Sequence, residues 1–132
     1  KIGYNEKLSH QMYAGADFIL MPSRVEPCGL NRMYALRYGT IPIVRNTGGL
    51  KDTVIDFGEE GARLKEAVGQ GFGIRFNQAS VWDITYSIHR AVELYADKEK
   101  MTEIRKQIMQ IDNSWEISAE KYITLYKATQ LI

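Results

Sequence analysis

The chain has 132 residues, a formal net charge of +1 and a single cysteine, Cys28. This length is enough for one domain with its own hydrophobic core. The balanced charge gives no reason to expect a nucleic-acid surface or a polybasic membrane patch. No apolar run is long enough to span a bilayer, and a lone cysteine, which forms neither an intrachain disulfide nor a zinc site by itself, predicts a cytoplasmic setting.

The first part of the chain predicts alternating helices and strands. Asn5 is a suitable N-cap for a first helix, and the apolar run 18–21 indicates a fully buried parallel strand. A helix with apolar residues at helical spacing follows over 30–38 and stops at Gly39. Residues 40–44, rich in β-branched side chains, form a second strand.

The remainder starts with a short helix that is expected to begin with residues 52–55, and Asp52 and Asp56 would share a solvated face of it. Residues 59–71 are interpreted as a loop with a possible helical turn over 62–68. A third strand over 71–76 and three successive helices follow, the first of them capped by Asn77 or Ser80. The alternation predicts an α/β fold, a Rossmann-like parallel sheet with helices on both faces, ending in consecutive helices.

The candidate site is the loop over 22–31, between the first strand and the second helix. A glycine-bearing loop that opens a helix presents free backbone N–H groups to an anion, and Glu26 lies on this loop. The loop after the second strand, over 45–50, should open on the same edge of the sheet. The alternative is structural: Pro27 and Gly29 shape a turn, and Glu26 is a solvated acid.

Other catalytic patterns are absent. Neither loop has a Walker or G-x-G-x-x-G pattern, which excludes the usual ATPase and dinucleotide signatures. His10 and His89 lie on different helices and are expected to be structural or exposed. No serine-centred elbow or Cys–His pair supports a hydrolase. Tyr4, ahead of the first helix, could stack on a nucleobase or belong to the core.

Three stretches, residues 22–30, 34–45 and 47–54, closely resemble bacterial glycogen synthases and plant starch synthases. Trp115 and the helix behind it are similar to the closing segment of those enzymes. The family has two Rossmann-like domains facing each other across a cleft, the GT-B architecture. By this resemblance, residues 1–132 are a single domain, a fragment of the C-terminal, nucleotide-sugar-binding domain of a larger two-domain enzyme.

The resemblance implies a retaining glucosyltransferase that extends an α-1,4-glucan at its non-reducing end from ADP-glucose or UDP-glucose. Glu26 would stabilise the oxocarbenium-like transition state beside the donor glucose. The residues expected to bind the substrate are Tyr4 at the adenine, Cys28, Gly29 and Leu30 along the sugar and diphosphate, Asn31 at the phosphates, and Thr47 and Gly48 at the border of the cleft. No metal or cofactor is expected, because amides and basic side chains would offset the diphosphate charge.

Two departures bear on the expected activity. Arg32 stands where these synthases usually carry glutamine, and it could contact a phosphate or only the surface. The arginine and lysine with which the family grips the phosphates belong upstream of Lys1, and the acceptor surface belongs to the N-terminal domain. The fragment is therefore expected to be inactive alone, and the uncovered apolar face of its last helix could cause self-association.

Two other functions stay open. The first is a related GT-B transferase acting on another acceptor, such as a lipid or a small sugar. Tyr34, at the position where many retaining transferases carry a second acid, favours the glucan synthases over this group. The second is a non-catalytic module whose cleft only binds a nucleotide or a partner. No nucleic acid or membrane partner is expected.

Overall fold

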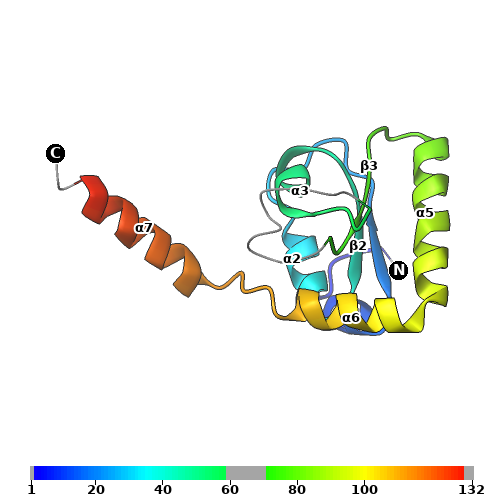
Figure 1. Ribbon diagram of the computed structural model, residues 1–132, viewed down its shortest axis with the longest axis horizontal. Coiled ribbons are helices and arrows are strands. Elements are labelled where there is room, and N and C mark those ends of the chain that lie inside the picture. The colour runs from blue at the N-terminus through cyan, green and yellow to red at the C-terminus, as the bar shows by residue number, and fades with distance from the viewer. Residues whose placement is uncertain (1, 59–70, 130–132) are drawn as a thin grey trace.

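The computed structural model describes residues 2–58 and 71–129. A three-stranded sheet lies between helices on its two sides, and a last helix stands apart (Figure 1). In chain order the elements are α1 (Glu6–Gly15), β1 (Phe18–Met21), α2 (Leu30–Arg37), β2 (Ile41–Arg45), α3 (Gly48–Thr53), β3 (Ile74–Phe76), α5 (Val81–Ala96), α6 (Lys98–Met109) and α7 (Trp115–Thr129).

The sheet has the order β1-β2-β3, and all of its pairings are parallel. In the register, Phe18 lies opposite Ile41, Met21 opposite Val44, and Ile43 opposite Ile74. This confirms the prediction that residues 18–21 and 41–44 are neighbouring parallel strands. Parallel strands need crossover connections, and α2 supplies the one between β1 and β2.

The core fills the space between the sheet and the helices on either side. Figure 1 shows α5 on one side of the sheet and α2 and α3 on the other, while α6 crosses beneath and packs against β2 and α2. The prediction of helices on both faces is therefore confirmed. The largest enclosed side chains, each less than 2 % exposed, include Leu36, Ile41, Leu50, Ile55, Phe72, Ile74 and Ile108.

Helix ends agree with the capping residues in the sequence. The Asn5 side chain accepts a hydrogen bond from the Leu8 N–H, and the Ser80 side chain accepts one from Asp83. Each satisfies one of the N–H groups that a helix start leaves without a partner. At the other end of α2, Gly39 has a φ of 76° and stops the helix, as expected.

The short helix was predicted in the wrong place. The helix α3 starts after Thr47 and ends at Thr53, so Val54 and Ile55 leave it and are buried. Asp56 then pairs with Gly73 as an isolated parallel bridge and is 4 % exposed. The expected solvated face with Asp52 is therefore wrong, because the β-branched residues draw the chain into the core. The possible turn over 62–68 lies outside the described residues.

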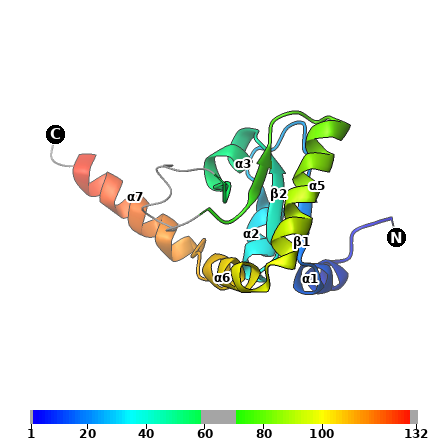
Figure 2. The ribbon, with the colours of Figure 1, turned by 45° about the vertical axis from the view of Figure 1, so that its right-hand side comes forward.

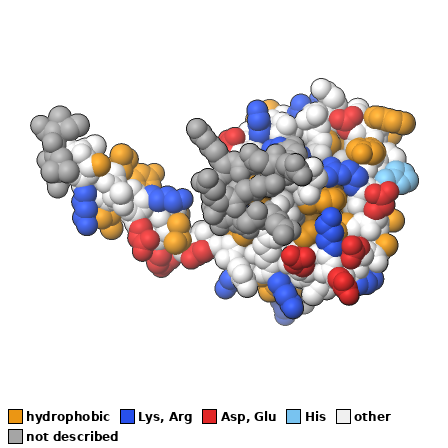
Figure 3. Space-filling view, in the orientation of Figure 1, with side chains coloured by type: hydrophobic (Ala, Val, Ile, Leu, Met, Phe, Trp, Pro, Cys, Tyr) orange, Lys and Arg blue, Asp and Glu red, His pale blue; other side chains and the backbone are white. Residues whose placement is uncertain are grey.

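The helix α7 has no buried residue within the described chain. It extends away from the other elements in both ribbon views (Figures 1 and 2). Hydrophobic side chains gather along its surface in Figure 3, and Trp115, Tyr122 and Tyr126 are 85 %, 58 % and 61 % exposed. Among the described residues, no helix is both long enough and apolar enough to cross a membrane.

Candidate functional site

The loop between β1 and α2 holds the Glu26 carboxylate through two hydrogen bonds. Oε1 accepts from the Gly29 N–H at 3.0 Å, and Oε2 accepts from the Ser23 hydroxyl at 3.2 Å. Gly29 has a φ of 80°, a conformation that glycine adopts without steric cost, and this turns the chain into α2. Glu26 is thus held at the mouth of the sheet, beside the start of a helix.

The second glycine loop lies against the first, as the sequence predicted. The Gly49 N–H donates to the Glu26 carbonyl at 3.1 Å, which fixes the backbone of the acid. A Cβ at Gly48, which has a φ of 46°, would run into the same carbonyl oxygen. Thr47 is the N-cap of α3, and its N–H donates to the Arg45 carbonyl at 2.8 Å. Thr47 and Gly48 therefore border the candidate site through the backbone.

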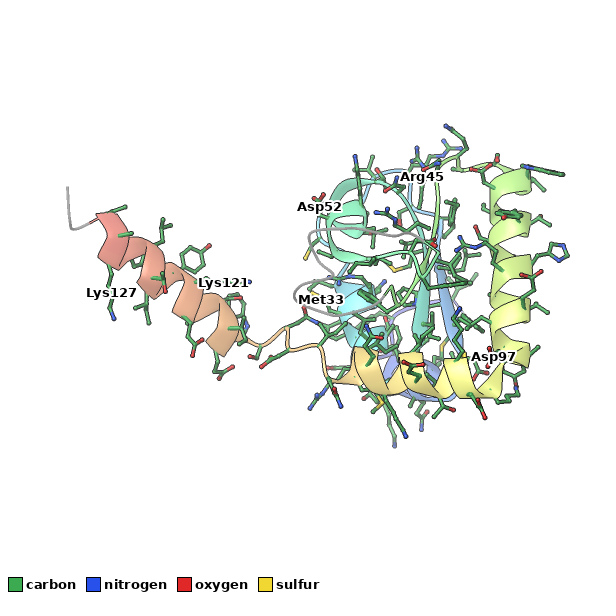
Figure 4. The ribbon with its side chains drawn as sticks, viewed as in Figure 1. Met33, Arg45, Asp52, Asp97, Lys121 and Lys127 are labelled. Atoms are coloured by element: carbon green, nitrogen blue, oxygen red, sulfur yellow. The ribbon has the colours of Figure 1, made fainter. Side chains whose placement is uncertain are left out.

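Two further residues position this loop, and the sequence analysis missed both. Arg45 ends β2 at the carboxyl edge of the sheet (Figure 4), and its Nη1 donates to the Arg24 carbonyl at 2.9 Å. Its Nε donates to the Asn77 carbonyl at 3.2 Å, so Arg45 joins the segments that follow β1 and β3. Ser23 binds the carboxylate itself. The only signal in the sequence was the place of these polar residues, just after a strand.

The start of α2 is the anion-attracting part of the site. Arg32 and Met33 donate their N–H groups to the Gly29 carbonyl. The N–H groups of Leu30 and Asn31 donate to none of the described residues, as is usual for a first helical turn. Together with the helix dipole they favour a negative charge.

A hollow of about 230 Å³ adjoins these groups. It is lined by Met21, Glu26, Pro27, Cys28, Leu30 and Asn31. Cys28 is exposed and has a free thiol. The hollow is therefore lined by the acid and by three of the predicted substrate-binding residues, Cys28, Leu30 and Asn31. The N–H of Gly29, a fourth predicted residue, donates to the Glu26 carboxylate instead.

Tyr4 stands apart from this group. Its side chain is 88 % exposed, and among the described residues no contact joins it to the Glu26 loop. It is near enough to Tyr13 to raise the pKa of that phenol, after burial and Tyr34, the larger causes. Tyr34 is 48 % exposed, and its ring lies 6.1 Å from that of Tyr13. The aromatic contact therefore joins α1 to α2, and Tyr4 lies outside it.

A larger cavity of about 500 Å³ lies elsewhere, between α2 and the segment that joins α6 to α7. Its lining includes Tyr34 and Arg37, together with residues 110–114. It contains none of the residues predicted for the site. This cavity is the larger of the two, but the smaller hollow is the one lined by the acid Glu26 and by Leu30 and Asn31, whose N–H groups have no partner among the described residues.

A Rossmann-like sheet with an acid and a free helix start on its carboxyl edge defines a class of proteins that bind ligands at this edge. The chain belongs to the family described as glycosyl transferases group 1, whose sequence model matches residues 2–108. This membership agrees with the resemblance noted from the loop motifs.

Within this family the chain is similar to glycogen and starch synthases. It is 59 % identical to the glycogen synthase of Flavobacterium johnsoniae, over 95 % of this chain and 24 % of that protein. It is 51 % identical to the glycogen synthase of Bacillus cereus, over 96 % of this chain and 25 % of that protein. The catalytic domain of starch synthase IV from Arabidopsis thaliana, solved bound to ADP and acarbose, superposes with a TM-score of 0.84 at 40 % identity, covering 96 % of this chain and 25 % of that one. The chain thus spans about a quarter of the length of these relatives.

Proposed function

We propose that this chain is the nucleotide-sugar side of an enzyme that transfers glucose from ADP-glucose or UDP-glucose to the non-reducing end of an α-1,4-glucan with retention. The main support for the proposal is the position of the Glu26 carboxylate, which accepts a hydrogen bond from the Gly29 N–H at 3.0 Å, at the start of α2. The named activity of the relatives supports it, and so does the starch synthase solved with ADP. The unpaired Cys28 fits a cytoplasmic enzyme.

The site would act through charge placement. As the bond from glucose to the diphosphate breaks, positive charge develops on the sugar and negative charge on the departing phosphate. Glu26 would face the first, and the N–H groups of Leu30 and Asn31, with the α2 dipole, would face the second. Ser23 and Gly29 hold the carboxylate in place before the donor arrives. Preorganised groups of this kind need little rearrangement during the reaction.

A second domain, across the cleft in a GT-B arrangement, would supply the acceptor surface. We propose that α7, whose residues are all outside the core, packs against that domain in the complete protein. The 132-residue chain alone would then lack both the acceptor side and the remaining phosphate-binding groups. We expect it to be inactive by itself.

The test is a charge-removing change in the full-length protein that contains this chain. Glu26→Gln keeps the size of the side chain and an oxygen that can accept from Gly29, but it removes the charge. We expect kcat with ADP-glucose or UDP-glucose and glycogen to fall by about 10²–10³-fold or more, as when a preorganised electrostatic group is lost. Asp52→Asn is the matched control, because it removes an exposed carboxylate from α3, and it should leave the rate unchanged.

The alternatives predict different results. A full-length protein that binds ADP but transfers no glucose to any acceptor would be a non-catalytic module. Transfer to a lipid or a small sugar, and not to glycogen, would indicate the related transferases. A folded Glu26→Gln variant with the wild-type rate would contradict the role given to Glu26.

A further inference from the structure

Arg32 is a buried cation for which the described part of the chain provides no counter-charge. It lies in the first turn of α2 and is only 4 % exposed. Its Nε is fully enclosed and has no hydrogen-bond partner. No hydrogen bond or ion pair joins its guanidinium to any residue in 2–58 or 71–129. The sequence analysis expected Arg32 at a phosphate or on the surface, and the structure excludes the surface.

Two other arginines of the fold, Arg90 and Arg105, are each paired with an aspartate. Arg90, whose side chain is 18 % exposed, is paired with the Asp56 carboxylate. Arg105, which is 35 % exposed, bonds Asp17 at 3.2 Å. Arg32 is more buried than either, yet no acid among residues 2–58 and 71–129 pairs with it. An unpaired buried charge is costly to a folded protein, and burial lowers the pKa of Arg32 accordingly.

Arg32 adjoins the candidate anion site, although it does not line the hollow itself. Its Nε lies 3.6 Å from the point where a Cβ on Gly29 would stand. The guanidinium is also within electrostatic reach of the Cys28 side chain, which lines the hollow beside Glu26. Glu26, the acid of this loop, is not its partner: the Glu26 oxygens accept hydrogen bonds from Ser23 and Gly29, and no hydrogen bond or ion pair joins them to Arg32.

We propose that Arg32 is a diphosphate-binding residue, whose missing counter-charge is the pyrophosphate group of the nucleotide-sugar donor. This inference rests on the proposed function and deepens it. The N–H groups of Leu30 and Asn31 would bind phosphate oxygens at the start of α2, and Arg32 would neutralise the charge from within the same turn. The free protein carries the cost of the unpaired cation, and donor binding removes it.

The experiment compares Arg32→Gln with the wild type in the full-length protein. Calorimetry with inorganic pyrophosphate, ADP and adenosine separates the phosphate contribution from the base. We expect Arg32→Gln to weaken pyrophosphate and ADP binding by about 10- to 100-fold, the range for a charge-assisted hydrogen bond. Adenosine should bind as before, and Arg32→Lys, which keeps the charge, should recover part of the loss. Arg37→Gln, an exposed arginine at the other end of α2, is the matched control.

Thermal unfolding of the ligand-free protein is the second measurement. The change in Tm caused by Arg32→Gln should differ in sign between a diphosphate-binding role and a structural role of Arg32. Because the unpaired charge is removed, Arg32→Gln should melt at the wild-type temperature or above it, and its Tm should rise less when ADP is added. A lower Tm for Arg32→Gln, together with an ADP affinity equal to that of the wild type, would make Arg32 structural and overturn the proposal. If Arg32→Gln does not fold, the wild type decides, and a Tm that pyrophosphate leaves unchanged would overturn the proposal. Equal pyrophosphate affinity in Arg32→Gln would also overturn it. A wild-type protein that neither binds ADP nor transfers glucose would instead contradict the proposed function itself.

Discussion

Asp56 holds three segments of the fold together through one buried carboxylate. Its carboxylate accepts hydrogen bonds from the Gly58 N–H at 2.8 Å and the Arg75 N–H at 2.6 Å. Both terminal nitrogens of Arg90 donate to it as well, one of them at 2.9 Å. The Asp56 side chain is 6 % exposed. One carboxylate therefore joins the segment after α3, β3 and α5.

Asp56→Ala leaves the Arg90 charge and two backbone N–H groups without their acceptor. Removing one partner of a buried ion pair costs about 3–5 kcal/mol, so we expect a loss of this size in the free energy of unfolding. The double variant with Arg90→Ala should lose less than the sum of the two single changes, by about 1–3 kcal/mol. Asp17→Ala breaks a pair whose side chains are 43 % and 35 % exposed, and should cost about 1 kcal/mol or less.

The measurement is urea unfolding of the purified protein at several pH values. Burial raises the pKa of Asp56, but the hydrogen bonds from Arg90, Arg75 and Gly58 and the Arg90 charge outweigh it, so the net pKa is lowered. The stability that Asp56 contributes is therefore present above its unfolded pKa of about 3.9 and is lost as the pH falls through the lower folded value. Asp56→Ala should lack this part of the acid transition. Equal losses for Asp56→Ala and Asp17→Ala at pH 7 would refute the reasoning.

The other two predictions concern the site loop and α7. Gly48→Ala should destabilise the protein by about 1–3 kcal/mol and lower the transfer rate, because the new Cβ meets the Glu26 carbonyl. Gly15→Ala, where a Cβ meets nothing within 4 Å, is the control, and equal unfolding free energies for the two variants would contradict the packing argument. The 132-residue chain should self-associate through the exposed face of α7, and Ile123→Lys should reduce this association. A monomer at all concentrations in sedimentation would count against that role of α7.

Much of the fold followed from local patterns. The strands over 18–21 and 41–44 are continuous apolar runs, which are typical of strands buried on both faces. Residues 41–44 are buried as expected. The expected full burial of 18–21 is wrong, because β1 lies at the edge of the sheet and leaves Leu20 40 % exposed. The caps at Asn5 and Ser80 and the stop at Gly39 depend on short-range hydrogen bonds and backbone angles. The loop motif around Glu26 is equally local, so the order of residues along the chain was enough to place the candidate site.

Long-range contacts decided what the sequence analysis missed. Asp56 had the spacing of a solvated acid, but β3 and Arg90, distant in sequence, enclose it. The start of α3 depends on the close approach of Gly48 to the Glu26 backbone. Which segments are strands or helices, and which loop contains the acid, followed from the order of residues, because those properties arise within a few neighbouring residues. Which charges are paired, and that Arg32 is buried without a partner in the described part of the chain, became clear from the packed fold alone, because burial depends on every element around a side chain.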